Sequence, residues 1–323
     1  MNQAFTLRPA VPGDGCLLID FFRALPAEAI AHFTPHSLSP KALEAECREP
    51  GRLLALDGDG KVLGYAVLDH FSHPVPELSL AVREIGKGYG TELLRQVKEY
   101  ARENGRDALR AVFDRTSLRT LRLLRLGGFS QAGFSLDGKL LYWGGVRPEF
   151  AQAKKLPPVC ETRVARDGTQ LTLRSVAPDD GPALSRFFAE MTDLGRSYYT
   201  PHPTDPEVLD RIARETSDEA DRFVLETVRD GEPRIGAYFI LSRLRDALPS
   251  MGVGAAAWLE GQGAGRIMLD FLQARARAYG RHAMRLTTHT SNLRAQKLYK
   301  TSGFEIIGTA SNGEYVMLCD LDR

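Results

Sequence analysis

The sequence repeats itself at long range, and this internal similarity constrains the fold more than any other feature of the chain. A shift of 166 residues places Thr6-Leu7-Arg8 on Thr172-Leu173-Arg174, and further along a shift of 175 places Gly128-Phe129 on Gly303-Phe304. The two shifts also align Phe21-Phe22 with Phe187-Phe188, Thr34-Pro35-His36 with Thr200-Pro201-His202, Arg48-Glu49 with Arg214-Glu215, and Gly86, Gly88 and Gly90 with Gly261, Gly263 and Gly265. This ordered series predicts two copies of one fold, with nine extra residues in the second copy around residues 216–250.

Prolines and lysines mark the boundary between the copies. Pro148, Lys154-Lys155 and Pro157-Pro158 fall in one short stretch, whose composition is typical of a linker. We therefore predict an N-terminal domain over residues 1–147, a linker over 148–163 and a C-terminal domain over 164–323. A chain of 323 residues is long enough for two domains of ordinary size.

Each copy is predicted to alternate strands and helices. In the first copy the hydrophobic pattern predicts strands at 5–8, 53–56, 62–68, 78–82 and 109–113. It predicts one helix that begins at residue 13, a second that begins after Ser39-Pro40, and two more at 90–103 and 118–126. In the second copy the corresponding later elements are predicted at 253–257, 265–279, 284–288 and 293–299. Asp137-Gly138 and Asn312-Gly313 are typical of two-residue hairpin turns. We therefore expect a mixed α/β (α+β) fold in each copy, with a central sheet flanked by helices.

The charge balance excludes some classes of partner. Lys plus Arg (42) nearly cancels Asp plus Glu (41), so we expect neither a nucleic-acid partner nor binding to an anionic membrane. The sequence shows no signal peptide and no long apolar run, which predicts a cytoplasmic protein. The four cysteines lie far apart, without the spacing of a metal site, so we expect free thiols and no bound metal.

A glycine-rich loop lies between a predicted strand and a predicted helix in each copy. Glycines let the backbone approach a ligand closely, and the amides at a helix N-terminus favour an anion such as a pyrophosphate. Neither loop has the third glycine of a dinucleotide fingerprint or the Gly-Lys-Ser/Thr of a Walker loop. A tight turn without a ligand is the alternative interpretation of the glycines alone.

A second motif follows the loop of the second copy. It consists of Asn292, Ala295, Leu298-Tyr299 and Gly303-Phe304. This series resembles the GNAT acetyltransferase superfamily, whose members carry Asn-x-x-Ala-x-x-Leu-Tyr followed by Gly-Phe. The glycine loop is similar to the pyrophosphate-binding segment of that family, normally Gln/Arg-x-x-Gly-x-Gly/Ala. The duplicated layout resembles tandem acetyltransferases such as mycothiol synthase, a comparison that supplies no acceptor.

The resemblance implies roles for individual residues, with acetyl-CoA as co-substrate. The backbone amides of residues 262–266 would hold the CoA pyrophosphate, and Tyr299 would be the general acid that protonates the departing thiolate. The strand ending at Ala257 would pair with the pantetheine arm, Asn292 would bond to that arm, and Lys300 would reach the adenosine phosphate. The implied cofactor-binding residues are Ala257, Gly261, Gln262, Gly263, Ala264, Gly265, Arg266, Asn292 and Lys300 in the second copy, and Val82, Lys87, Gly88, Tyr89 and Gly90 in the first.

Both copies depart from the family pattern. The Gln/Arg position of the family is Ile85 in the first copy and Glu260 in the second. The first copy also has Ser117 and Leu124 at the positions of Asn292 and Tyr299, and leucine cannot donate a proton. Glu77 occupies the region where many family members place a carboxylate base. The second copy has no such carboxylate near Gly252, which leaves His289 or a chain of waters as the proton acceptor.

The leading prediction is transfer of an acetyl group from acetyl-CoA to a primary amine of a small molecule, mainly in the second copy. One alternative is a non-catalytic sensor or scaffold that binds acetyl-CoA. Another is acetylation of a protein lysine or N-terminus, favoured by a possible acidic rim of Asp205, Glu207 and Asp210. The repeated His36 and His202 line an acceptor cleft or, as we favour, support a turn; Tyr198 and Tyr199 are candidate pocket walls.

Overall fold

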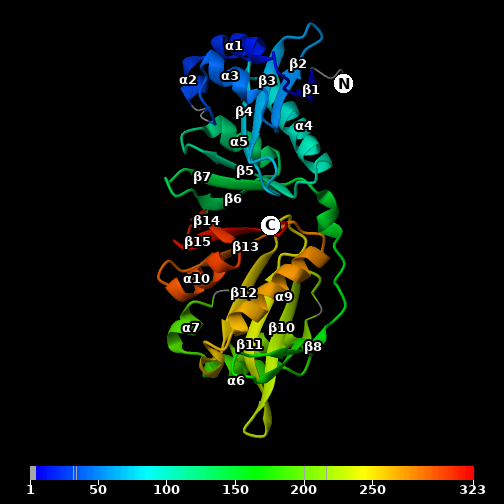
Figure 1. Ribbon diagram of the computed structural model, residues 1–323, viewed down its shortest axis with the longest axis vertical. Coiled ribbons are helices and arrows are strands. Elements are labelled where there is room, and N and C mark those ends of the chain that lie inside the picture. The colour runs from blue at the N-terminus through cyan, green and yellow to red at the C-terminus, as the bar shows by residue number, and fades with distance from the viewer. Residues whose placement is uncertain (1–4, 32, 34, 200, 216) are drawn as a thin grey trace. The chain divides into compact units, whose positions relative to one another are not determined.

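The chain forms two compact units, Met1–Arg147 and Pro148–Arg323. The computed structural model describes residues 5–31, 33, 35–199, 201–215 and 217–323 (Figure 1). Each unit is a mixed α/β fold with its own strands, helices and hydrophobic clusters, as the repeat predicts.

In the N-terminal unit, helices pack on both faces of the sheet. The elements are β1 (Thr6–Pro9), α1 (Gly15–Arg23), α2 (Ala27–Ala31), α3 (Pro40–Glu46), β2 (Arg52–Leu56), β3 (Val62–Asp69), β4 (Glu77–Val82), α4 (Tyr89–Glu103), β5 (Ala108–Phe113), α5 (Leu118–Leu126), β6 (Ser130–Phe134) and β7 (Leu140–Gly145). The strand order is β1-β2-β3-β4-β5-β7-β6. Neighbouring residues of one strand, such as Leu53 and Leu54, enter different clusters, one beneath α4 and the other beneath α1 and α3.

The C-terminal unit repeats this plan and adds a strand at its edge. The elements are η1 (Pro148–Gln152), β8 (Cys160–Val164), β9 (Gln170–Ser175), α6 (Gly181–Glu190), α7 (Asp193–Ser197), α8 (Pro206–Arg214), β10 (Ala220–Arg229), β11 (Glu232–Ser242), β12 (Ser250–Ala255), η2 (Ala257–Leu259), α9 (Ala264–Ala278), β13 (Ala283–Thr288), α10 (Leu293–Thr301), β14 (Phe304–Thr309) and β15 (Tyr315–Asp320). The strand order is β8-β9-β10-β11-β12-β13-β15-β14. Figure 1 shows α9 lying across the strands β10 to β12.

A single pair of parallel strands interrupts each otherwise antiparallel sheet. β4 and β5 pair only at Glu77 and Arg110, and β12 and β13 pair only at Ser250 and Arg285. Beyond these positions the two strands of each pair bond to their other neighbours alone. We call the unpaired stretch between residues 251–255 and 286–288 the opening between β12 and β13. The strand to which the family resemblance assigns the pantetheine arm therefore parts from its parallel neighbour in the backbone.

Strand pairing corrects the alignment of the two copies around this opening. Tyr65 and Tyr238 are equivalent because each hydroxyl lies 3.1 Å from one of the repeated histidines, so the preceding residues Gly64 and Ala237 correspond. Gly64 faces Val82 across the N-terminal sheet, and Ala237 faces Ala255 across the C-terminal one. Val82 therefore corresponds to Ala255, an offset of 173 instead of 175. Two of the extra residues lie between β12 and the glycine loop, outside the predicted stretch. The predicted strand end at Ala257 is wrong for the same reason, because this residue begins the short helix η2.

Part of the predicted linker is regular structure. Residues 148–152 form the 3-10 helix η1, and Cys160–Val164 form β8, which pairs antiparallel with β9. Alternate residues of β8 are exposed, as expected for an edge strand with little apolar signal. The stretch is a strand because its backbone pairs with β9, and its side chains alone do not indicate that pairing.

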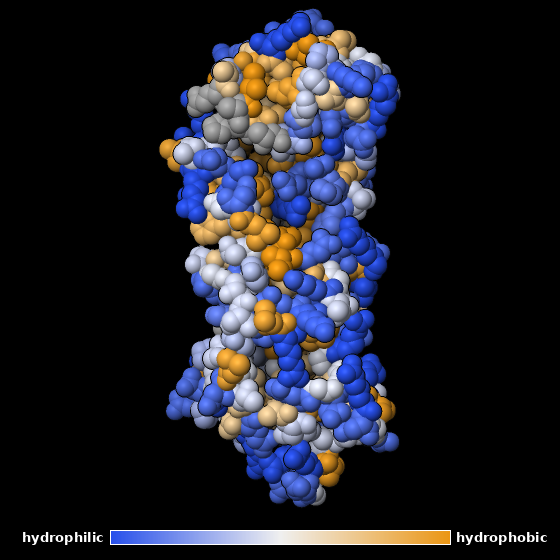
Figure 2. Space-filling model, turned by 60° about the vertical axis from the view of Figure 1, so that its left-hand side comes forward, coloured by the Kyte–Doolittle hydropathy of each residue, from blue (hydrophilic) through white to orange (hydrophobic). Residues whose placement is uncertain are grey.

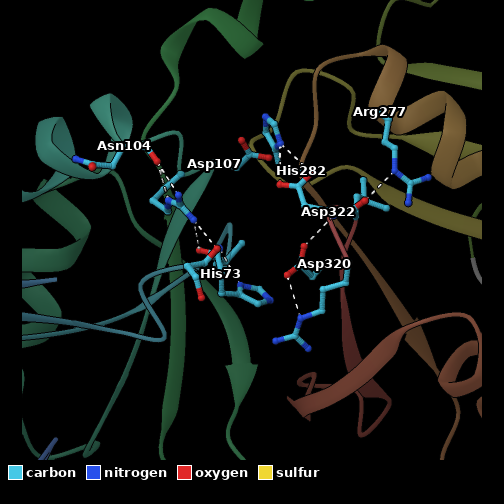
Figure 3. Close-up of polar contacts among 12 residues, drawn as sticks. His73, Asn104, Asp107, Arg277, His282, Asp320 and Asp322 are labelled. Atoms are coloured by element: carbon cyan, nitrogen blue, oxygen red, sulfur yellow. Dashed lines mark hydrogen bonds and ion pairs between the residues drawn. The ribbon is translucent and has the colours of Figure 1, made fainter. Parts of the chain in front are cut away.

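Polar contacts hold the segments that lead into and out of the sheets. Arg106 donates to the backbone oxygens of Ser72 and Asn104, and Arg277 donates to that of Leu321 (Figure 3). His282 pairs with Asp322 at 3.0 Å. Figure 2 shows hydrophilic residues interleaved with apolar ones on the face displayed, in agreement with the balanced composition. Among the described residues, no helix is long and apolar enough to cross a membrane.

Candidate active site

The two glycine loops have nearly the same backbone. Gly86 and Gly88 have φ of 83° and 81°, and Gly261 and Gly263 have φ of 80° and 86°. These angles lie in the left-handed region, which glycine enters without the steric cost that a Cβ imposes. Gly88 caps α4 and Gly263 caps α9. No described atom lies within 4 Å of a Cβ built on Gly86, Gly88 or Gly261, so the loops face open space.

Unpaired amides concentrate at the start of α9. The N–H groups of Gly263, Ala264 and Gly265 form no hydrogen bond with any residue that the structure describes. The flanking amides are internally bonded, since Gln262 donates to the Leu259 carbonyl and Arg266 donates to the Gly263 carbonyl. The predicted run of five binding amides is thus narrowed to three. Three amides at the positive end of a helix, bonded to no described residue, are suited to bind an anion.

The third glycine of the C-terminal loop serves helix packing. A Cβ on Gly265 would stand 2.7 Å from Leu298 of α10, whereas one on Gly90 would stand 3.5 Å from Leu123 of α5, which is an ordinary contact distance. Glycine therefore lets the helix after the loop approach the helix that carries the second motif.

Cations surround the C-terminal loop. The side chain of Arg166, from the turn between β8 and β9, lies 3.3–3.7 Å from a Cβ built on Gly263, and its backbone N–H donates to the Gln262 carbonyl. No described residue forms an ion pair with Arg166. Glu260, the acidic departure from the family motif, forms an ion pair with Arg294 of α10, which neutralises its charge beside the loop. Lys300 is exposed on α10.

Tyr299 is buried on α10, in the second half of the Asn292–Phe304 motif. Its ring contacts Phe304, and burial raises the pKa of its hydroxyl to about 12. No described residue hydrogen-bonds that hydroxyl. The group is therefore protonated at neutral pH and has its proton available for a ligand. Its counterpart Leu124 is equally buried and belongs to the core beneath α4.

Asn292 has a structural role in addition to its predicted one. Its side-chain oxygen accepts a hydrogen bond from the Ala295 amide at 3.2 Å and so caps α10. Gln296, which sequence reasoning overlooked, is buried and donates to the carbonyls of His289 and Thr290. The cap and this glutamine together fix the turn between β13 and α10. The sequence signal for Gln296 is its position as a polar residue on the inward face of a predicted helix.

Tyr198, Ser291 and His289 form a hydrogen-bonded chain. The Tyr198 hydroxyl lies 2.7 Å from the Ser291 Oγ, which lies 2.7 Å from the His289 Nδ1. The Tyr198 ring stacks on the His289 imidazole with centroids 5.3 Å apart. The sequence offers Tyr198 and His289 as separate candidates, and only the fold connects them.

The repeated histidines occupy equivalent structural positions. His36 Nε2 lies 3.1 Å from the Tyr65 hydroxyl, and His202 Nε2 lies 3.1 Å from the Tyr238 hydroxyl. Burial lowers the pKa of His202, so the neutral imidazole is favoured. These contacts agree with a supporting role for the histidines. Thr34 and Thr200 of the repeated motif lie outside the described residues.

Glu77 is held by an ion pair. Its carboxylate lies 3.2 Å from the Arg110 guanidinium across the one paired position of β4 and β5. The corrected alignment makes Ser250 its counterpart, because Ser250 pairs with Arg285 in the same way. The C-terminal unit therefore has no carboxylate at this position. Among the described residues, no group of histidine, cysteine, aspartate and glutamate side chains is arranged to hold a metal ion.

Two parted parallel strands, a left-handed glycine turn and unpaired helix amides define a class of α/β proteins built to hold an extended, phosphate-bearing ligand. The Acetyltransferase (GNAT) family matches residues 20–129 and 188–304, which together span more than half of the chain. The chain therefore belongs to the GNAT acetyltransferase family, with one domain of that family in each half.

Solved structures that match this chain align with about half of it. The GNAT domain of S. lividans PAT is 17% identical, with a TM-score of 0.44, over 50% of this chain and 96% of that domain. The PaiA N-acetyltransferase from Thermoplasma acidophilum, solved with coenzyme A, is 15% identical, with a TM-score of 0.40, over 46% of this chain and 98% of its own. The ribosomal-protein-S18-alanine N-acetyltransferase from Escherichia coli is 19% identical, with a TM-score of 0.36, over 47% and 94%. Comparison with curated proteins gives no match.

Proposed function

We propose that the protein is an acetyl-CoA-dependent N-acetyltransferase and that its C-terminal unit transfers the acetyl group to a primary amine. The observation that carries this proposal is the combination, in one unit, of three unpaired amides on α9 and a buried, protonated Tyr299 on the adjoining α10. Family membership supports the reaction class.

The C-terminal loop suits the pyrophosphate of CoA. The amides of Gly263, Ala264 and Gly265 would donate to phosphate oxygens, and Arg166 would add a positive charge from the β8–β9 turn. The unpaired edge of β12, which ends at Ala255, would bond to the amides of the pantetheine arm. The thioester supplies the activated acetyl group; the protein positions it and moves protons.

Tyr299 suits the role of general acid. The attacking amine forms the new C–N bond as the C–S bond breaks, and the departing sulfur needs a proton. A tyrosine whose pKa is raised by burial keeps its proton until a developing thiolate comes within reach. A backbone amide facing the thioester would stabilise the oxyanion of the tetrahedral intermediate.

The N-terminal unit keeps the loop and lacks the acid. Its glycine geometry matches that of the C-terminal unit, so Val82, Lys87, Gly88, Tyr89 and Gly90 remain candidates for holding CoA. Leu124 cannot protonate a thiolate. We propose that this unit contributes no transfer activity, with or without a bound ligand.

We propose a small-molecule amine as the acceptor in preference to a cationic peptide. The proposed acidic rim consists of residues engaged in or near α8: Asp205 precedes its first turn, Glu207 lies in that turn, and Asp210 pairs with Arg214 at 3.1 Å. Carboxylates at a helix N-terminus have a structural explanation of their own. This observation favours an amine metabolite over a lysine-rich peptide.

Two measurements test the proposal. Calorimetric titration with acetyl-CoA gives the number of sites per chain, and release of free CoA thiol in the presence of a panel of amines gives turnover. We expect saturable binding and amine-dependent thiol release. Binding without turnover on amines and peptides would favour a sensor, and absence of binding at millimolar acetyl-CoA would rule out the transferase.

A further inference from the structure

The hydrogen-bonded chain beside the opening between β12 and β13 has a defined direction. The backbone N–H of Ser291 donates to the His289 Nδ1 at 3.2 Å, so this nitrogen carries a lone pair in the neutral ring. The Ser291 hydroxyl, 2.7 Å from the same nitrogen, therefore donates its only proton there. The Tyr198 hydroxyl must in turn donate to Ser291. The order of donation is Tyr198 to Ser291 to His289.

The chain spans the two sides of that opening. Tyr198 follows α7, which packs against β12, and the neighbouring Tyr199 ring lies 3.4 Å from a Cβ built on Gly254. Ser291 and His289 follow the end of β13. The hydrogen bond between Tyr198 and Ser291 thus connects strands that share no backbone pairing beyond Ser250 and Arg285.

We propose that the hydrogen-bonded series of Tyr198, Ser291 and His289 is the proton acceptor for the amine in the C-terminal unit. The inference rests on the proposed function, because it concerns the nucleophile of that reaction. A primary alkyl amine is largely protonated near neutral pH and must lose a proton before it attacks. The corrected alignment leaves Ser250 at the position of Glu77, so a strand carboxylate does not provide the base.

Every proton that leaves the amine is accounted for by the three hydrogen-bonded side chains. The ammonium group gives one proton to the Tyr198 oxygen, while the Tyr198 proton moves to Ser291 and the Ser291 proton moves to the His289 Nδ1. The His289 ring becomes an imidazolium, and because it is exposed it returns the proton to solvent. The freed amine attacks the thioester, and Tyr299 protonates the departing sulfur.

The test uses two probe nucleophiles, n-butylamine and hydroxylamine, on the full chain. Butylamine needs a base near neutral pH, whereas hydroxylamine is already largely neutral. We expect His289→Asn and Ser291→Ala to reduce transfer to butylamine by about 10²-fold or more and to leave transfer to hydroxylamine within a few-fold of wild type. The butylamine rate of His289→Asn should then rise tenfold per pH unit, because only free amine reacts.

Controls separate a proton path from a structural contact. His282→Asn changes a half-buried histidine at the other end of β13, paired with Asp322, and should leave both rates unchanged. The dissociation constant for acetyl-CoA should be the same in all variants. Equal losses with both probes, or unchanged butylamine transfer in His289→Asn, would overturn the proton path while leaving the transferase intact. A wild type that binds acetyl-CoA and acetylates neither probe would overturn the path as drawn, and one that binds no acetyl-CoA would remove the proposed function itself.

Discussion

The two glycine loops differ little in backbone and greatly in the side chains around them. In both loops, two glycines adopt left-handed angles and the second caps the following helix. Beside the C-terminal loop stands Arg166, which forms no ion pair with any described residue, and Tyr299 is buried on the adjoining α10. Leu124 fills the tyrosine position of the N-terminal unit. The comparison shows that the fold preserves the backbone of the loop by itself, because the left-handed glycine angles suffice for it. Chemistry depends on a few side chains that the fold does not require.

The largest expected effect is at Tyr299 of α10, because the corresponding position of α5 is Leu124, which has no proton to donate. Tyr299→Phe should lower kcat for amine acetylation by about 10²–10⁴-fold and leave the dissociation constant for acetyl-CoA unchanged, because only the proton is removed. Leu124→Met, the matched change in the N-terminal unit, should leave turnover unaltered. Equal turnover of wild type and Tyr299→Phe would remove the catalytic distinction between the units.

The pH dependence follows from the same tyrosine. Burial raises its pKa to about 12, so the proton-bearing form persists below that pH and is lost only as pH rises through it. The wild-type rate should therefore show no alkaline decline from loss of this acid up to about pH 10. A decline centred well below that pH, abolished in Tyr299→Phe, would contradict the burial of the hydroxyl.

Substitution of the capping glycines Gly263 and Gly88 compares the two loops in acetyl-CoA binding and turnover. Gly263→Val forces a β-branched residue into a left-handed conformation at a cost of about 1–2 kcal/mol and displaces Arg166. We expect acetyl-CoA binding at the C-terminal site to weaken at least tenfold by calorimetry and turnover to fall with it. Gly88→Val imposes the same backbone strain in open space and should leave turnover unchanged. Loss of turnover in Gly88→Val would assign activity to the N-terminal unit.

A smaller effect is expected at Arg166. Removal of one charge-assisted contact to a phosphate in Arg166→Ala should weaken acetyl-CoA binding by about 3- to 30-fold, more at low ionic strength than at high. Lys87→Ala is the matched control on the N-terminal loop, and it should not change the KM for acetyl-CoA. Identical affinity of wild type and Arg166→Ala at low salt would show that the β8–β9 turn takes no part in binding.

The smallest effect concerns thiols, of which each unit has one exposed and one buried. Burial raises the pKa values of Cys47 and Cys319 to about 11, whereas Cys16 and Cys160 are exposed. Ellman's reagent should therefore modify about two thiols rapidly in the native protein at neutral pH and the remaining two only on unfolding. Rapid reaction of Cys319 alone among the buried thiols would mean that the C-terminal core opens more readily than the N-terminal one.

The sequence by itself determined the duplication, the fold class and the location of both loops. Glycine spacing and hydrophobic periodicity are local signals, and the start of α3 after Ser39 and the limits of α5 at Leu118 and Leu126 follow from them. The Asn292–Phe304 motif identified the family for the same reason, since its residues are close together in the chain.

Only the tertiary structure decided how distant residues meet. Strand pairing moved the counterpart of Glu77 to Ser250, and it turned residues 160–164 into an edge strand. Packing placed Arg166 beside Gly263, nearly a hundred residues away, and joined Tyr198 to Ser291. Such contacts depend on where each element lies in the folded sheet, and neither composition nor periodicity specifies a register between strands or a hydrogen bond across an opening.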